Sequence, residues 1–247
     1  MSKVEQYPGM TVLRDGDVVR VEFDSPTTRN ALGGDALDAL NRVIDEVPAC
    51  GLLILIGAGG AFTSGGDRRE LAPLGSEAEQ AAVLRTRASL VEKIRSLDAV
   101  SIAAIDGACV GLGVGLAAAC TLRLVSDRAF VDTAYLRLGL SGDFGCAHLL
   151  SELIGRGAAA DWLLRPRRIP AAELVATGFA QTLWSTDAFD AEVQETVRTL
   201  AAHSSVARQG ITANIRDAAR LDLSRALDAE SRRHVHAKIH PSVHTAH

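Results

Sequence analysis

The chain has 247 residues, of which 47% are hydrophobic and only 4% aromatic, so it can bury the core of one large domain. Its net charge of −4 and the lack of a basic patch argue against a nucleic-acid partner or an anionic membrane surface. Every apolar stretch is broken by Asp or Gly before the ~18 residues that a membrane span needs. The cysteines form no CxxC pair, and no apolar leader follows the first residues. We therefore expect a cytoplasmic protein with reduced thiols and no metal site.

The first half of the chain predicts repeated units of strand, Gly-rich loop and helix. Residues 11–14 and 18–23 flank Asp-Gly and predict a β-hairpin, and Asp35 is placed as the cap of the helix that follows. Buried strands are expected where apolar runs show no polar alternation. These strands lie at 52–56, 100–105 and 122–125, with Gly-rich loops at 57–66 and 107–115, a helix at 77–96 and a small-residue helix from Leu116. A recurring strand, loop and helix predict an α/β fold of stacked ββα turns.

The last quarter of the chain has a different pattern. Strand signals stop after about Thr186, and amphipathic helices are predicted at 188–202, 206–219 and 223–236. We therefore divide the chain into a core at residues 1–186 and a helical module at residues 187–247.

Two Gly-rich loops, residues 62–67 and 111–115, each end a buried strand and lead into a helix. At such a junction the backbone N–H groups are unpaired within the helix and lie at the positive end of its dipole. Two such junctions that converge could hold a developing oxyanion and polarise a thioester carbonyl without a metal. The same pattern also serves close packing, so the residues alone leave both interpretations open.

A nucleotide site is the rival interpretation of the second loop. Gly111-x-Gly113-x-Gly115 lacks the final spacing of the dinucleotide fingerprint, and no GxxxxGK[ST] motif occurs. The sequence therefore argues against nucleotide binding at this loop.

Several motifs occur together in a recognisable order. They are Arg29-Asn30-Ala31-Leu32, residues 57–67, 103–107, 139–145, 153–159 and 171–178. In this combination the chain resembles the crotonase, or enoyl-CoA hydratase/isomerase, superfamily from residue 10 to about 235. The resemblance implies a ββα spiral core, a C-terminal helical trimerisation module and assembly as a homotrimer or dimer of trimers. It also implies an acyl-CoA thioester substrate, no cofactor beyond the CoA that the substrate carries, and oxyanion donors at the N–H groups of Gly66 and Leu112.

The chain departs from the family at both hydratase glutamates. The resemblance places one at the position of Gly115 and the other at the position of Tyr135. Addition of water across a double bond needs a base for the water and an acid for the α-carbon. We therefore do not expect an ordinary hydratase.

Asp143 is the carboxylate that remains. Dienoyl-CoA isomerases and 4-chlorobenzoyl-CoA dehalogenase are similar to this chain in carrying an Asp here, as a base in the first and a nucleophile in the second. Asp143 is therefore a candidate catalytic residue, although Asp in a Ser-Gly-Asp turn also serves as a cap. Tyr135 is a second candidate, either as a hydrogen-bond donor or as a wall of the site.

The resemblance also suggests residues that contact the substrate: Arg29, Ala31, Ser64, Asp67, Gly111 and Gly142. Arg29 and Arg68-Arg69 are candidates for the CoA phosphates, and surface solvation is the alternative. Asp67 is expected mainly to brace its loop, and His148 is expected to pack or to cap.

Double-bond isomerisation of an enoyl-CoA is the leading expectation. Hydrolysis, dehalogenation, decarboxylation and C–C cleavage remain alternatives with the same enolate chemistry. A catalytically weak acyl-CoA-binding or assembly subunit is the alternative from another class, because both glutamates are absent. Pro241 and a polar tail also stand where the family's final helix is expected, which could alter CoA affinity.

Overall fold

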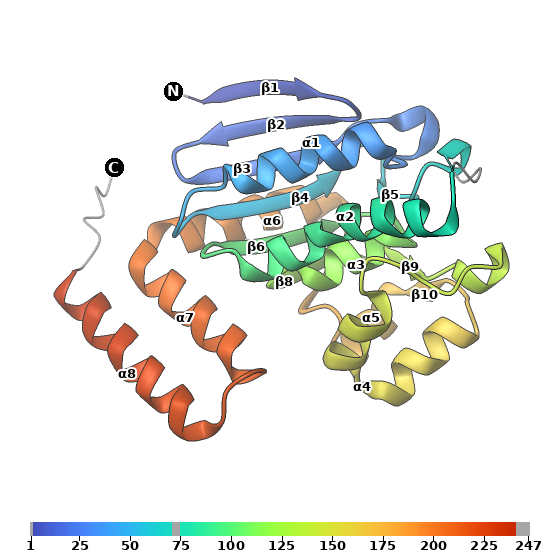
Figure 1. Cartoon of the computed structure of the whole chain (residues 1–247). Coiled ribbons are helices and arrows are strands. Elements are labelled where there is room, and N and C mark those ends of the chain that lie inside the picture. The colour runs from blue at the N-terminus through green and yellow to red at the C-terminus, as the bar shows by residue number, and fades with distance from the viewer. Residues whose placement is uncertain (1, 71–74, 241–247) are drawn as a thin grey trace.

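The structure, a computed structural model, describes residues 2–70 and 75–240, so Pro241 and the tail lie outside the described residues (Figure 1). The strands are β1 (Lys3–Tyr7), β2 (Met10–Asp15), β3 (Val18–Phe23), β4 (Leu52–Gly57), β5 (Ala61–Thr63), β6 (Val100–Ile105), β7 (Ala108–Val110), β8 (Leu122–Ser126), β9 (Phe130–Asp132), β10 (Ile169–Pro170) and β11 (Thr182–Trp184). The α-helices are α1 (Gly34–Asp45), α2 (Glu77–Ser96), α3 (Leu112–Ala119), α4 (Cys146–Leu164), α5 (Ala171–Ala176), α6 (Thr186–Ala202), α7 (Ser205–Ala218) and α8 (Leu223–Ile239). Short 3-10 turns are η1 (Pro26–Thr28), η2 (Arg68–Glu70) and η3 (Tyr135–Leu138).

The strands form two sheets that share the turns of a spiral. The larger sheet has the order β1-β2-β3-β4-β6-β8-β11, and the smaller has the order β10-β9-β7-β5. The pairs β4–β6, β6–β8, β5–β7 and β7–β9 are all parallel. Each turn therefore places one strand in each sheet and then continues into a helix, as in β4-β5-α2 and β6-β7-α3. This confirms the predicted α/β fold with a ββα spiral core.

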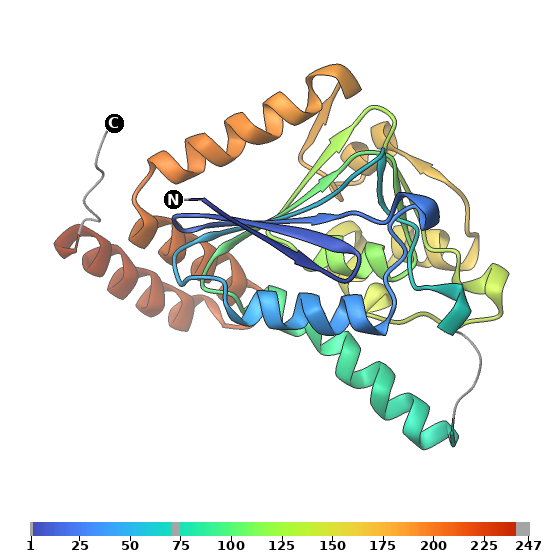
Figure 2. The same ribbon diagram turned by 90° about the horizontal axis from the view of Figure 1, so that it is seen from above.

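The large sheet is covered on both faces, as its apolar strands predict. Leu53 and Leu55 of β4 face the main core under α1–α4, whereas their neighbours Leu52 and Ile54 join a second cluster with Phe189 of α6. Figure 2 shows α6 on the opposite side of the sheet from α1 and α2.

Local details differ from the sequence expectations. Gly33, not Asp35, is the N-cap of α1, because the backbone already turns there, and Asp35 lies in the first turn, where its charge favours the helix dipole. Helix α3 begins at Leu112 rather than Leu116. Glycines disfavour a helix, but all eight residues of α3 are buried, so packing overrides propensity. The predicted Gly-rich loops also contain the short strands β5 and β7.

The C-terminal helices form a separate feature beside the spiral. Helices α7 and α8 lie side by side in both views and extend away from the sheets (Figures 1 and 2). The boundary at residue 186 stays a prediction, and α6, although placed in the module, buries Phe189 and Val193 against the sheet. Among the residues that the structure describes, no helix has the length and hydropathy needed to cross a bilayer.

Candidate active site

The first Gly-rich loop is held by a buried asparagine. Asn30 is fully buried, and its Nδ2 donates to the carbonyl oxygens of Ala58 and Ala61 at 2.9 and 2.7 Å. Its Oδ1 accepts from Ser25 N–H at 2.8 Å, and its own backbone has a positive φ of 61°. Asparagine tolerates this left-handed conformation, which lets one side chain tie the segment after β3 to the loop before β5.

Hydrogen bonds between the segment after β3 and the first Gly-rich loop also bring together three residues that were predicted to bind substrate. The Ser64 N–H donates to the Arg29 carbonyl at 2.9 Å, and Ser64 Oγ donates to the Thr28 carbonyl at 2.7 Å. The Ala31 N–H donates to Thr28 Oγ1 at 3.3 Å. Arg29, Ala31 and Ser64 therefore share one edge of the site, and the exposed Arg29 side chain is free to reach a ligand.

The two Gly-rich loops touch each other. A Cβ on Gly65 would lie 3.0 Å from the Val110 carbonyl oxygen, and a Cβ on Gly66 would lie 3.4 Å from Leu112 Cδ2. Gly65 and Gly111 also have positive φ values, of 99° and 55°. Glycine is thus required for the close approach that sets the two loops side by side.

This approach places two unpaired donors near each other. Among residues 2–70 and 75–240, no hydrogen-bond acceptor is found for the backbone N–H of Gly66 or of Leu112. Gly66 is exposed, and Leu112 is the first residue of α3, where a helix leaves its N–H groups unpaired. The pair has the donors and the helix polarity of an oxyanion hole.

A third segment, residues 135–145, carries the candidate side chains. It runs from η3 through a loop in which Gly142, Phe144 and Gly145 have positive φ values of 106°, 47° and 66°. Phe144 is buried and its backbone packs on α3 at Gly115, one turn beyond Leu112. This contact brings the loop to the helix that begins with the second donor.

Tyr135 and Asp143 face each other across this loop. Tyr135 Oη donates to Asp143 Oδ1 at 2.8 Å, and the Tyr135 ring packs on Gly142. Burial raises the pKa of Asp143 above its ordinary 3.8, while the hydrogen bond from Tyr135 lowers it. Burial also raises the pKa of Tyr135 far above its usual range, so Tyr135 stays a hydrogen-bond donor.

The neighbouring thiol belongs to the wall of the site. The Cys146 N–H donates to the Asp143 carbonyl at 3.0 Å, and burial raises the pKa of the thiol to about 12. A thiol is nucleophilic as its thiolate, so Cys146 is a packing residue at neutral pH.

Asp67 is bonded within its own loop, and its role toward a substrate stays a prediction. Its Oδ1 accepts from the Arg69 backbone N–H at 2.9 Å, and its side chain pairs with the Arg69 guanidinium. These bonds lower the pKa of Asp67 to about 2, so it is a poor base. The pairing also engages Arg69, whereas Arg68 is exposed.

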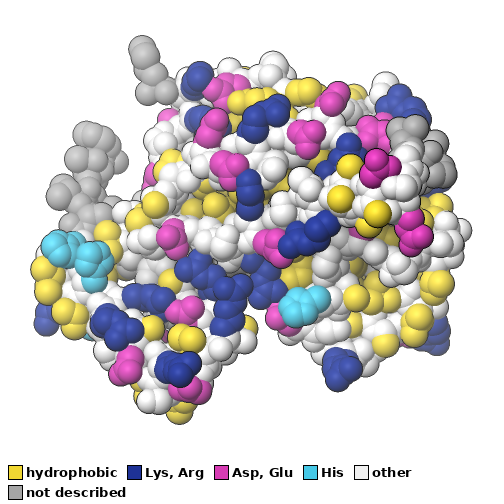
Figure 3. Space-filling model, in the orientation of Figure 1, with side chains coloured by type: hydrophobic (Ala, Val, Ile, Leu, Met, Phe, Trp, Pro, Cys, Tyr) yellow, Lys and Arg dark blue, Asp and Glu magenta, His cyan; other side chains and the backbone are white. Residues whose placement is uncertain are grey.

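His148 is placed differently from the prediction that it packs or caps. It is exposed, and its Nε2 lies 3.0 Å from Glu152 Oε1 one helical turn along α4, a position that the amphipathic pattern favours for a polar residue. Glu152 also pairs with Arg95 of α2 at 2.5 Å. These charged groups line a hollow between α2, α4 and the end of α7, where Figure 3 shows the dark-blue and cyan side chains gathered.

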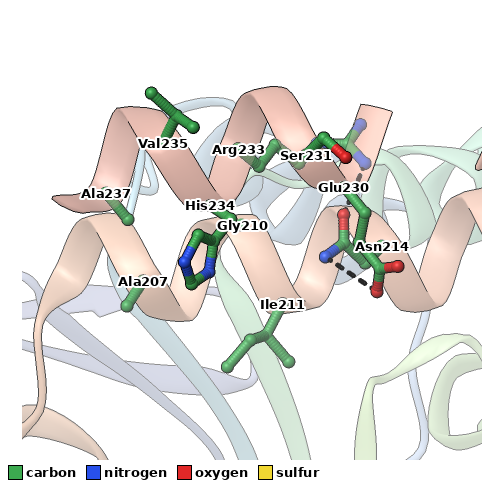
Figure 4. A pocket seen from close by; sticks show the side chains of 10 residues that line it. All are labelled: Ala207, Gly210, Ile211, Asn214, Glu230, Ser231, Arg233, His234, Val235 and Ala237. Carbon is green, nitrogen blue, oxygen red and sulfur yellow. Dashed lines mark hydrogen bonds between the residues drawn. The ribbon is translucent and has the colours of Figure 1, made fainter. Parts of the chain in front are cut away.

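A separate cavity of about 610 Å³ lies between α7 and α8 (Figure 4). Its polar groups bind one another: Asn214 Nδ2 donates to Glu230 Oε1 at 3.4 Å, and Arg233 donates to Asn214 Oδ1 at 2.7 Å. The cavity belongs to the helix pair, and we place the candidate active site at the three loops instead.

The absence of a metal site stays a prediction. Within the described ranges no group of three or more His, Cys, Asp or Glu side chains is arranged to hold a metal ion. The loops supply backbone N–H donors and the half-buried Asp143 carboxylate, and these groups suit a polarised carbonyl.

Comparison with known proteins agrees with this fold. The family model for enoyl-CoA hydratase/isomerase matches residues 14–245. A 4-chlorobenzoyl coenzyme A dehalogenase of Arthrobacter sp. is 30% identical over 193 residues, which cover 75% of this chain and 69% of the relative. A peroxisomal Delta(3,5)-Delta(2,4)-dienoyl-CoA isomerase of Arabidopsis thaliana is 29% identical over 187 residues, covering 69% of this chain and 67% of the relative.

Solved structures give the same result. The crystal structure of a putative enoyl-CoA hydratase from Thermobifida fusca YX in complex with CoA superposes with a TM-score of 0.87 at 29% identity, covering 94% of this chain and 93% of the other. The fold is thus that of the α/β spiral enzymes that act on acyl-CoA thioesters. The chain belongs to the enoyl-CoA hydratase/isomerase family.

Some residues that shape the site were not singled out from the sequence. Asn30 and Thr63 clamp the first loop, the latter through a 2.6 Å bond from its Oγ1 to the Asn30 carbonyl. Phe144 seats the third segment on α3. Asn30 follows two threonines and Arg29, so its polarity does not stand out in the sequence, and no local signal marks a Phe that adopts a left-handed conformation.

Proposed function

We propose that this family member isomerises the double bond of an enoyl-CoA thioester. In this mechanism the N–H groups of Gly66 and Leu112 bind the thioester oxygen, and the Asp143 carboxylate removes a proton from the acyl chain. The electron pair moves into a dienolate whose charge rests on the bound oxygen. The protonated Asp143 then returns the proton to the other end of the three-carbon unit. One carboxylate suffices, because no water is added.

The observation that carries this proposal is the hydrogen bond from the buried Tyr135 to the half-buried Asp143. A base works best when its pKa approaches the working pH, and burial shifts Asp143 in that direction. Tyr135 occupies one carboxylate oxygen and leaves Oδ2 with no hydrogen-bond partner among the described residues. That oxygen is available for the transferred proton.

Hydration and dehalogenation are less well supported by the residues present. Both require a second group that activates water. Asp143 is the single carboxylate between residues 135 and 145, and Asp67 is held by Arg69 with its pKa lowered to about 2. We therefore keep the dehalogenase and the other enolate reactions as alternatives, and the weak binding or assembly subunit as the non-catalytic alternative.

The proposed substrate and assembly follow from the family and the surface. A CoA complex of a similar structure supports an acyl-CoA ligand. That no separate cofactor is needed stays part of the proposal. For assembly we propose a homotrimer or a dimer of trimers in the cytoplasm. Its support is a set of exposed apolar side chains on the C-terminal helix pair: Ile211, Ile215, Leu223, Leu227, Val235 and Ile239.

The test is product analysis in D₂O with 3-enoyl-CoA and 2-enoyl-CoA thioesters of several chain lengths. The proposal predicts a shifted double bond, deuterium on the α- or γ-carbon, and no 3-hydroxyacyl product. Accumulation of a hydrated product would contradict it. Tight CoA binding without exchange or turnover across the set would favour the binding subunit instead.

A further inference from the structure

Gly115 of α3, which the resemblance places at the position of a hydratase glutamate, lies against the loop that carries Asp143. A Cβ on Gly115 would lie 2.4 Å from the carbonyl oxygen of Phe144 and 2.9 Å from its Cβ. Distances below 3.0 Å are not sustained between such atoms, and the nearest obstacle is backbone rather than a flexible side-chain end. A side chain at residue 115 must therefore displace the loop.

The loop is poorly able to absorb that displacement. Phe144 is 2% exposed and already adopts a left-handed φ of 47°, which is uncommon for a bulky residue. It is fixed on one side by Gly145, the N-cap of α4, and on the other by Asp143, whose carbonyl accepts from the Cys146 N–H. Close-packed interiors transmit such strain instead of relaxing locally.

Asp143 immediately precedes Phe144, so its position depends on this contact. Gly115 also lies three residues after Leu112, which puts both residues on one face of α3. The contact thus sets the placement of the carboxylate relative to the second oxyanion donor. We propose that Gly115 is a positioning residue that seats the Asp143 turn on α3. This inference rests on the proposed function of Asp143.

The inference has a specific consequence for substitutions. Alanine is a better helix former than glycine, so helix propensity alone predicts that Gly115→Ala leaves the protein unharmed or more stable. The steric contact predicts instead that the turn shifts, Asp143 becomes more hydrated and its proton-transfer geometry is lost. Gly157→Ala is the matched control, because nothing lies within 4 Å of a Cβ at that position of α4.

The experiment measures kcat, KM and the pH dependence of kcat/KM for the wild type, Gly115→Ala and Gly157→Ala with the enoyl-CoA that the wild type isomerises. We expect Gly115→Ala to lower kcat at least tenfold with little change in KM. The acid limb of the kcat/KM profile of Gly115→Ala should move to lower pH, because hydration lowers the pKa of Asp143. Gly157→Ala should match the wild type. A wild type without turnover refutes the proposed function, whereas an active wild type with unchanged Gly115→Ala kinetics refutes only this inference.

A rescue variant covers the case in which Gly115→Ala is poorly folded. Phe144→Gly makes a positive φ inexpensive and removes the Phe Cβ, so the double variant Gly115→Ala/Phe144→Gly can let the turn move aside. Recovery of soluble protein in the double variant supports the contact as the cause. Phe144→Gly alone measures the cost of removing the buried ring. If that single variant folds and the double variant is lost as fully as Gly115→Ala, Gly115 acts elsewhere in α3 and the inference is overturned.

Discussion

Tyr135 Oη donates a 2.8 Å hydrogen bond to Asp143 Oδ1, eight positions further along the chain, and Tyr135 is buried whereas Asp143 is half-buried. By its resemblance to the family, the tyrosine stands at the position of a hydratase glutamate. We propose that it orients the carboxylate beside it as a neutral hydrogen-bond donor, and that Asp143 carries the proton without a second carboxylate to activate water.

Removal of the tyrosine hydroxyl should change the pH dependence of turnover. The hydrogen bond from Tyr135 lowers the pKa of Asp143, so Tyr135→Phe should raise that pKa. That hydrogen bond stabilises the ionised carboxylate, so we expect the acid limb of the kcat/KM profile to move to higher pH. The check is a pH–rate profile of both proteins. An acid limb at the same pH in both proteins would show that Tyr135 does not affect the pKa of the titrating group.

The raised pKa of Asp143 also predicts a pH-dependent stability. A carboxyl group whose pKa is raised by folding binds more protons in the native state than in the unfolded state. The fold therefore loses stability as the pH rises above 3.8, the ordinary pKa of Asp. Asp143→Asn removes this effect and keeps the size of the side chain. We expect the variant to melt at a higher temperature than the wild type at pH 7.

Thermal unfolding measured from pH 7 toward pH 4 checks this sign. The difference in Tm between Asp143→Asn and the wild type should shrink as the pH falls, because the wild-type carboxyl becomes protonated. A variant that is less stable at neutral pH would show that the ionised carboxylate is stabilising, contrary to the burial of Asp143.

The oxyanion donor at Leu112 can be removed without breaking its helix. Leu112 is the first residue of α3, a position that tolerates proline because its N–H is unpaired within the helix. Leu112→Pro should therefore keep the helix, although it gives up part of a buried side chain, and should lower kcat by about 10²–10³, or roughly 3–4 kcal/mol of transition-state stabilisation. Leu112→Met is the control that keeps the N–H and most of the volume. Equal rates for the two variants would place the hole elsewhere.

Restoring both glutamates should not create a hydratase. In Gly115→Glu/Tyr135→Glu the first side chain meets the Phe144 backbone, so the Asp143 loop must move before the pair can assemble. We expect less isomerisation and no gain of crotonyl-CoA hydration above the wild-type level. The measurement is hydration rate with circular dichroism alongside, and a folded double variant that hydrates efficiently would show that the loop adapts easily.

The large pattern of the fold was predictable from the sequence because it depends on local signals. Unbroken apolar runs predicted β4, β6 and β8. Helix α2 was predicted with the bounds that it has in the structure, and a capping box of Ser76 and Glu79 marks its start. Helix α3 was predicted four residues too late, because Gly113 and Gly115 disfavour a helix unless tertiary neighbours require them.

The candidate site was predictable only in part for a similar reason. Loop glycines and Asp143 could be matched to a family pattern, whereas the Tyr135–Asp143 bond and the Phe144–Gly115 contact join segments that only the folded chain brings together. No periodicity or spacing encodes such contacts.

The central claim is that Asp143 transfers the proton. The most direct measurement is the kcat of Asp143→Asn on the enoyl-CoA that the wild type isomerises, together with the Kd for CoA. Asparagine keeps the size of the side chain and can still accept from Tyr135, but it lacks a basic oxygen. The account predicts that kcat falls by about 10²–10⁴ while CoA binding stays near that of the wild type. Turnover close to the wild-type rate would contradict it.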